Sequence, residues 1–223
     1  MAAARTASPS RSLLALQLES DFAAMTQRRS KGAQRELSVV SAAVELIAEQ
    51  GLAQLRMVDV AERAGMSVGH VTYYFPSKTE LLVRAIQQSE EQFQAEVREA
   101  LQRHDDGWGR LVALVGLAAA SGPNDPGWLL WFEVWANAAV DPELAEVQRQ
   151  LDGWWRQQMA EVIAYGTDQG VFHVADPDRA VSVLSALTDG LSVQLALGSD
   201  AATRPQLLEI VTDVARDMLG VEA

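Results

Sequence analysis

The stretch AERAGMSVGHVTYYF, residues 61–75, decides the fold, because it predicts two short helices joined by a tight turn. Residues 61–64 end the first helix, Gly65 makes the turn, and Ser67 caps the second helix. Gly65 has no Cβ and can therefore adopt the left-handed conformation that ends a helix sharply. Small or apolar side chains stand where the two helices meet, at Val60, Ala61, Ala64, Met66, Val71 and Tyr74.

The second helix of this pair has an outward face that is not needed for packing against the first helix. The outward residues are Val68, Gly69, His70, Thr72 and Tyr73. Two crossed helices with an exposed second member are typical of a helix-turn-helix, whose second helix enters the major groove of DNA. The stretch therefore predicts a DNA-binding unit.

Composition limits the classes of protein that the chain can belong to. Its 223 residues are 48% hydrophobic and 22% charged, as in an ordinary folded protein. The absence of cysteine excludes disulfides, thiolate catalysis and cysteine-ligated metals. The three histidines lie far apart in the sequence, and no nucleophile elbow or phosphate loop occurs. We therefore expect no metal, no cofactor and no enzyme activity.

No apolar run reaches the roughly 18 residues that cross a bilayer, and the start lacks a signal-peptide pattern. We expect a cytoplasmic protein without a membrane span. The net charge of −12 is unusual for a DNA-binding chain, but it is unevenly distributed. Residues 1–84 carry 10 Lys/Arg against 8 Asp/Glu, whereas residues 85–223 carry 8 against 22. Because screening limits phosphate attraction to about 10 Å, only the first part is suited to approach DNA.

Hydrophobic periodicity predicts an all-α chain of about nine helices. The expected helices cover 34–49, 56–64, 67–75, 77–104, 108–120, 126–139, 142–169, 177–197 and 205–219. We expect residues 1–27 to be a flexible N-terminal extension and residues 28–78 to be the helix-turn-helix domain. Residues 79–223 would then form a helical bundle for ligand binding and dimerisation.

Several motifs resemble, in order, the DNA-binding domain of TetR-type transcriptional regulators. They are EQG (49–51), DVAERAG (59–65), MSVGHVTYYF (66–75) and PSKTELL (76–82). The remainder is similar to the branch that contains the betaine-pathway repressors, through WLLWFEVWANAAVDPEL (128–144), GTDQGVFHVADPDRA (166–180) and ALTDGL (186–191). The resemblance implies a homodimeric, ligand-responsive regulator, a repressor released from a palindromic operator by a small-molecule effector. The alternative is an all-α small-molecule-binding protein or corepressor that has lost DNA binding.

The resemblance also implies which residues contact double-stranded DNA. Tyr73 and Tyr74 would hold phosphates, Lys78 would add an ammonium at a helix N-terminus, and His70 and Thr72 would face base edges. The full expected set is Lys31, Arg56, Ser67, Val68, Gly69, His70, Thr72, Tyr73, Tyr74 and Lys78. Many family members have Thr at the position of Arg56 and Tyr at that of Thr72, so operator sequence does not carry over. Tyr74 has an equally good interpretation as a core residue.

Aromatic side chains gather in two adjacent predicted helices, at Trp128, Trp131, Phe132, Trp135, Trp154 and Trp155. One interpretation is a chamber for a cationic or flat apolar effector, with Glu133 or Asp189 as counter-charge. The other is a bulky helical core. On an ideal helix Glu133 faces away from Trp131 and Trp135, which share a face. The expected ligand-binding residues are Trp131, Trp135, Trp155, Met159 and Asp189. For Asp189, inside an otherwise apolar helix, a cap or an inter-helix salt bridge is an equally good interpretation.

Two apolar stripes occupy the last two predicted helices. The first contains Val181, Leu184, Leu187, Leu191 and Leu195, and the second Leu207, Ile210, Val211, Val214 and Met218. Pairing of both helices with their copies would give a four-helix homodimer interface, with two DNA-reading helices about 34 Å apart. The alternative is that both stripes pack only within one chain. Effector binding would shift the long helix over 77–104 and change the separation of the reading helices.

Overall fold

The computed structural model describes residues 32–199 and 203–221, and this part of the chain is helical without a strand. The all-α prediction is confirmed. A first helix covers 32–50. The others are α2 (Met57–Arg63), α3 (Val68–Tyr74), α4 (Lys78–Gln102), α5 (Gly107–Ala118), α6 (Pro126–Ala138), α7 (Pro142–Asp168), α8 (Pro177–Ala196) and α9 (Arg204–Leu219). None of the described helices is long and apolar enough to cross a membrane. Lys31 and the predicted 1–27 extension lie outside the described residues.

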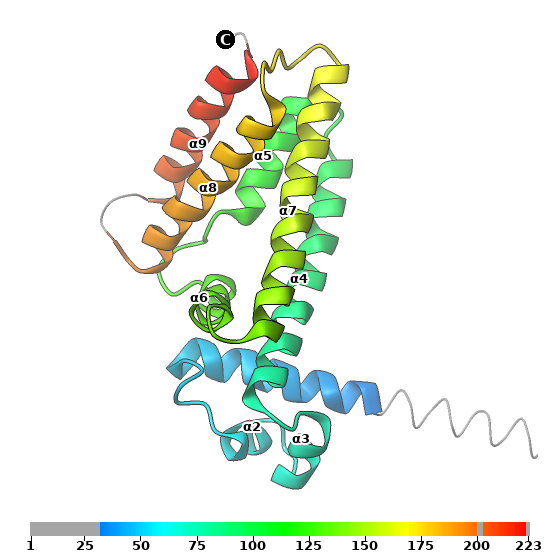
Figure 1. Cartoon of the computed structure of the whole chain (residues 1–223), viewed down its shortest axis with the longest axis vertical. Helices are drawn as coiled ribbons and strands as arrows, with labels where there is room; N and C mark the ends of the chain where they lie inside the picture. Colours follow the sequence, from blue (N-terminus) through cyan, green and yellow to red (C-terminus); the bar gives the residue numbers. More distant parts are fainter. Residues whose placement is uncertain (1–31, 200–202, 222–223) are drawn as a thin grey trace, which may run out of the picture.

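Figure 1 shows an elongated molecule with the helix over 32–50, α2 and α3 at one end. We call residues 32–77 the head. The long helices α4 and α7 run side by side away from it, and α5, α8 and α9 lie at the far end. Helix α6 lies between the head and these distal helices. At about 1.5 Å per residue, the 25 residues of α4 span close to 40 Å, so one helix connects both ends.

Three helices begin with the same pair of residues, Asp followed by Pro. The carboxylates of Asp125, Asp141 and Asp176 accept hydrogen bonds from backbone N–H groups in the first turns of α6, α7 and α8. The proline that follows has no N–H to leave unpaired and a φ angle already suited to a helix. These pairs explain why the predicted starts of α6, α7 and α8 agree with the structure.

The buried apolar side chains form two cores. The first core joins the head and the start of α4 to Leu130 and Val134 of α6 and to Leu144 and Val147 of α7. The second core joins the rest of α4 and α7 to α5, α8 and α9. The head is therefore packed against α6 and α7 as well as connected through α4.

Candidate functional site

The head contains the helix-turn-helix that the sequence predicts. Gly65 has φ +65°, in the left-handed region, and the N–H of Met66 bonds the carbonyl of Ala61 at 2.8 Å. Ser67 Oγ accepts the N–H of His70 at 3.3 Å and caps α3. Val71 is the only buried residue of α3 and packs into the first core. A single inward anchor thus leaves most of α3 at the surface.

Every predicted DNA-contacting residue on α3 is exposed except Tyr74. Tyr73 is 80% exposed and meets the half-buried Tyr74 edge-on, with ring centroids 5.5 Å apart. Tyr74 packs against the first core, while the next residue, Phe75, is buried in it. The two interpretations of Tyr74 are therefore compatible, because the side chain packs against the core and is still only half-buried.

Several predicted polar contacts already have local partners. Thr72 Oγ1 donates to the carbonyl of Val68 at 3.0 Å. His70 Nδ1 lies 3.1 Å from Ser67 Oγ, and the other ring nitrogen of the exposed His70, Nε2, has no partner within the described residues. Arg56 forms a two-pronged ion pair with Asp59, at 2.7 Å for both hydrogen bonds. Lys78 is exposed, and within the described residues no carboxylate pairs with it.

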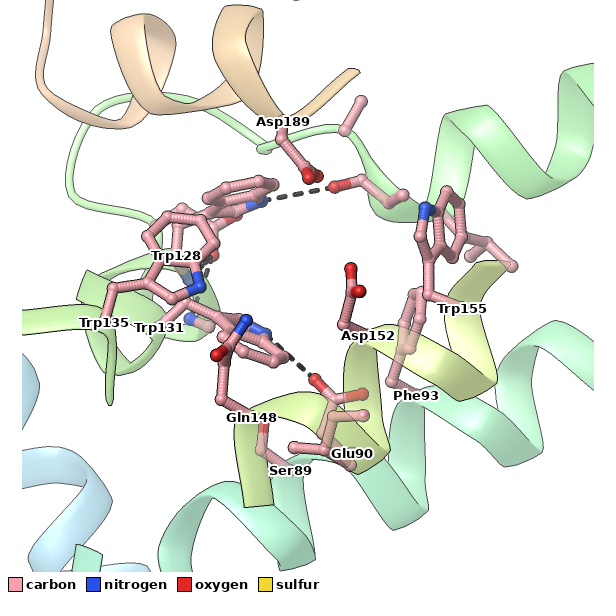
Figure 2. Close-up of a pocket in the computed structure, with 16 residues that line it drawn as sticks. Ser89, Glu90, Phe93, Trp128, Trp131, Trp135, Gln148, Asp152, Trp155 and Asp189 are labelled. Atoms are coloured by element: carbon pink, nitrogen blue, oxygen red, sulfur yellow. Dashed lines mark hydrogen bonds between the residues drawn. The ribbon is translucent and has the colours of Figure 1, made fainter. Parts of the chain in front are cut away.

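A chamber of about 450 Å³ is enclosed by residues of α4, α6, α7 and α8 and by the end of α5. Its lining residues are Ser89, Glu90, Phe93, Leu117, Ala118, Ala119, Asp125, Gly127, Trp128, Trp131, Trp135, Gln148, Leu151, Asp152, Trp155 and Asp189. Its volume is in the range of small-molecule sites. Figure 2 shows tryptophans of α6 on one side of this space and Phe93 with Trp155 on the other.

The aromatic walls are held by their own contacts. Trp135 lies 5.6 Å from Trp131 and 5.9 Å from Trp128, measured between ring centroids. Trp128 Nε1 donates to the carbonyl of Ala118 at 3.2 Å, and Trp155 Nε1 donates to Ser185 Oγ at 3.1 Å. Because both N–H groups already have acceptors within the protein, the orientation of each ring is restrained.

Three carboxylates face the chamber from different helices, those of Glu90, Asp152 and Asp189 (Figure 2). Glu90 is only 8% exposed, and its Oε1 accepts Trp131 Nε1 at 2.9 Å. Burial raises the pKa of Glu90, although this hydrogen bond opposes the effect. Burial, assisted by the negative charge of Asp152, raises the pKa of Asp189 to about 6. Asp125 is already occupied, because its Oδ2 accepts the Ser121 hydroxyl and its Oδ1 caps α6.

The structure brings four of the five predicted ligand-binding residues together, because Trp131, Trp135, Trp155 and Asp189 all line the chamber. It differs from the prediction at Met159, which is fully buried in the second core and does not line the chamber. Met159 follows Trp155 by one helical turn, but at this level α7 packs against α5.

Glu133, one of the two suggested counter-charges, does not line the chamber, and its carboxylate binds the N–H of Leu52 instead. Sequence reasoning missed Glu90 and Asp152. A signal for Glu90 exists, because it lies four residues after Ile86 and three before Phe93, on the apolar stripe of α4. A carboxylate on a buried stripe points to a polar site.

The residues of the two C-terminal apolar stripes differ in how deeply they are buried. Val181, Leu184, Leu195, Leu207 and Val211 are buried within the second core. Leu187, Leu191, Val214 and Met218 are half-buried, and Ile210 is 41% exposed. Helices α8 and α9 therefore pack on each other and keep a partly apolar outer side.

A helix-turn-helix head connected by a continuous helix to a helical domain with a ligand-sized chamber defines a DNA-binding transcriptional regulator. A family model described as bacterial regulatory proteins, tetR family, matches residues 39–85. A second, described as BetI-type transcriptional repressor, C-terminal, matches residues 108–220, which is about half of the chain. The chain therefore belongs to the tetR family, with a C-terminal part of the BetI type, and is a regulator and not an enzyme.

Individual relatives agree with this assignment. The regulator BetI of Stenotrophomonas maltophilia (strain R551-3) is 33% identical over 124 residues, covering 53% of this chain and 61% of that protein. BetI of Pseudomonas aeruginosa (strain LESB58) is 28% identical over 193 residues, covering 85% and 95%. A putative regulator from Saccharomonospora viridis, solved in complex with choline, superposes with a TM-score of 0.79 at 28% identity, covering 86% of this chain and all of that one.

Proposed function

We propose that the chain is a homodimeric repressor that leaves a palindromic operator when a small organic cation fills the chamber. The chemical class of the effector is inferred from the residues that line the chamber. It combines Phe93 and four tryptophans with the carboxylates of Glu90, Asp152 and Asp189. Among the lining residues, all of which belong to the described part of the chain, none is Lys, Arg or His.

This lining favours a cation for two physical reasons. Aromatic faces attract a cation placed over them, an effect worth about 0.5–2 kcal/mol for each well-placed ring. The carboxylates of Asp152 and Asp189 have no hydrogen bond or ion pair with another described residue, so both are available to a cation, and the half-buried Asp189 would gain a counter-charge from it. The choline complex of the Saccharomonospora viridis regulator supports a quaternary ammonium as the first compound to test.

The exposed surface of α3 supports the DNA side of the proposal. Tyr73 and Lys78 would bind phosphates, because both are exposed and Lys78 is the first residue of α4. His70 Nε2 and the accepting lone pairs of Thr72 would face base edges. Ser67, Val68 and Gly69 begin α3 and would lie nearest the groove, with Arg56 and Lys31 beside the DNA backbone.

The outer side of α8 and α9 supports homodimerisation. Ile210 is exposed, and Leu187, Leu191, Val214 and Met218 are only half-covered by their own chain. A second copy would cover these side chains, and a two-fold axis would place two copies of α3 on successive major grooves. Selection of bound sites from random DNA tests this arrangement. An inverted repeat is expected, and an isolated half-site would contradict it.

The effector class is tested with choline and its neutral isostere 3,3-dimethyl-1-butanol. Tryptophan fluorescence reports binding, and a gel-shift assay on the selected operator reports release. Choline should bind at least about tenfold more tightly than the alcohol and should release the operator. Equal affinities would indicate an apolar chamber, and failure of choline to bind would contradict the quaternary-ammonium class.

A further inference from the structure

Helix α6 has one face in the chamber and another in the head. Trp128, Trp131 and Trp135 line the chamber. Leu130 and Val134, which are 1% and 0% exposed, belong to the first core together with the head. Figure 1 shows the same arrangement, with α6 directly above the helix over 32–50. Any displacement of α6 by a ligand must therefore be accommodated by the packing of the head.

Trp131 links these two faces. Its side chain lines the chamber, packs against the first core, and donates to Glu90 of α4. Protein cores are packed too densely to absorb a shift of a large ring without a response of their neighbours. A ligand that displaces Trp131 thus acts on the first core and on α4 together.

A polar contact joins the opposite side of α6 to the head. Glu133 Oε1 accepts the backbone N–H of Leu52 at 2.8 Å, across 81 positions of sequence, in a half-buried setting. Within residues 32–199 and 203–221, no other hydrogen bond joins the head to α5–α9. Hydrogen bonds to a charged group are stronger than those between neutral groups, so this contact restrains the head more than a neutral one would.

The turn that contains Leu52 is fitted to this carboxylate. Gly51 ends the helix over 32–50 with φ +76°, and a Cβ added there would lie 3.1 Å from Glu133 Oε1. Leu52 then accepts the N–H of Leu55 at 3.1 Å, and α2 begins at Met57. Only four residues thus lie between Leu52 and α2, the first helix of the helix-turn-helix.

We propose that Glu133 is a positioning residue that transmits occupancy of the chamber to the helix-turn-helix through its hydrogen bond with Leu52. With the chamber empty, the carboxylate holds the 51–55 turn, and with it α2 and α3, in the operator-binding position. A ligand that moves the tryptophans of α6 moves Glu133 on the same helix and weakens this restraint. The inference rests on the proposed function, because it assumes that the effector binds in the chamber and opposes operator binding.

The first test compares Glu133→Ala and Glu133→Gln without effector. Alanine removes the acceptor, whereas glutamine keeps an Oε1 that can accept the same N–H. Operator affinity should fall about tenfold in Glu133→Ala and stay within about threefold of wild type in Glu133→Gln. Glu96→Ala is the matched control, because Glu96 is exposed on α4 and makes no hydrogen bond or ion pair with a described residue.

The second test adds choline. Its Kd, measured by tryptophan fluorescence, should stay within about threefold of wild type in both Glu133 variants, because Glu133 does not line the chamber. Saturating choline should weaken operator binding at least about tenfold in wild type and less than about threefold in Glu133→Ala. A purely structural loss would lower thermal stability without separating choline affinity from the operator response.

Three results would overturn the proposal. They are wild-type operator affinity in Glu133→Ala, an equal loss in Glu133→Gln, and an undiminished choline response in Glu133→Ala. If wild type binds choline but keeps its operator, the proposed release by choline is wrong, and the ligand-free comparison still decides whether Glu133 holds the head in its operator-binding position.

Should Glu133→Ala unfold, hydrogen exchange of the Leu52 amide in wild type replaces it. Choline should speed this exchange at least about fivefold, and an unchanged rate counts against the proposal.

Discussion

Helix α3 and the chamber use their side chains in opposite ways. Helix α3 is one run of seven residues that exposes nearly all of its side chains, with Tyr73 80% accessible. The chamber draws residues from α4, α5, α6, α7 and α8 and buries a carboxylate, Glu90, to 8% exposure. A contiguous exposed surface suits a large external partner, whereas an assembled concave one suits a small ligand. Mutations in α3 should therefore impair operator binding without changing ligand affinity, and mutations in the chamber should do the reverse.

The largest expected effect is a loss of operator affinity when the exposed surface of the head is mutated. Tyr73→Ala with Lys78→Ala removes two phosphate contacts from each copy, four in a dimer. At roughly 1 kcal/mol or more for each contact, operator affinity should fall about a thousandfold. Fluorescence anisotropy on labelled operator measures the loss, and choline affinity should not change.

The matched control for this double variant is Arg98→Ala, an exposed cation on the distal part of α4. It should bind operator as wild type does, because it lies far from the head. Retention of operator affinity by the double variant would favour the alternative function, in which the helix-turn-helix no longer reads DNA.

The next largest effect tests whether Met159 belongs to the second core or to the chamber. Met159 is fully buried in the second core, so Met159→Ala should lower the free energy of unfolding by about 3 kcal/mol through lost contacts and a cavity. Urea denaturation measures this change. Choline affinity should stay within about threefold, because the side chain does not line the chamber. A large loss of choline affinity at unchanged stability would place Met159 in the binding site after all.

The same comparison explains what the sequence could predict. The helix-turn-helix depends on neighbours in the chain, such as Gly65 with its left-handed φ and the cap at Ser67, and both were predictable. The Asp-Pro pairs fixed the starts of three helices for the same reason. Local physical chemistry is enough wherever the interacting groups are a few residues apart.

The chamber depends on groups that the sequence separates. Glu90 lies in the largely polar run QQSEEQF (87–93), where only its helical spacing from Ile86 and Phe93 indicates burial, and its partner Trp131 is 41 residues away. Helical spacing indicated that Glu133 faces away from the tryptophans, but not that it reaches Leu52. Periodicity assigns a residue to a face of its helix, and only the tertiary packing decides what that face meets.

A smaller effect is expected from one carboxylate of the chamber. Asp189→Asn keeps the shape of the side chain and removes its charge, so choline should bind about tenfold more weakly. Operator affinity without effector should not change. Asp178→Asn, at an exposed position of the same helix, is the control in tryptophan fluorescence titrations. An unchanged choline Kd in Asp189→Asn would remove Asp189 from the binding site.

The smallest expected effect is a pH dependence of choline affinity, which arises from a carboxylate of the chamber and not from the head. Because the pKa of Asp189 is raised to about 6, the group is mostly neutral at pH 5 and mostly ionised at pH 7.5. Choline affinity should therefore rise about fivefold over this interval, and this rise should shrink in Asp189→Asn.

Stability should change in the opposite direction. The raised folded-state pKa means that the neutral form of Asp189 favours folding below about pH 4, and this contribution is lost as the pH rises through about 6. Thermal melts at pH 5 and 7.5, compared between wild type and Asp189→Asn, isolate the contribution of this group. A bound cation should restore the lost stability at pH 7.5, because it binds the ionised form. Equal choline affinity at both pH values would contradict an ionised Asp189 as the counter-charge.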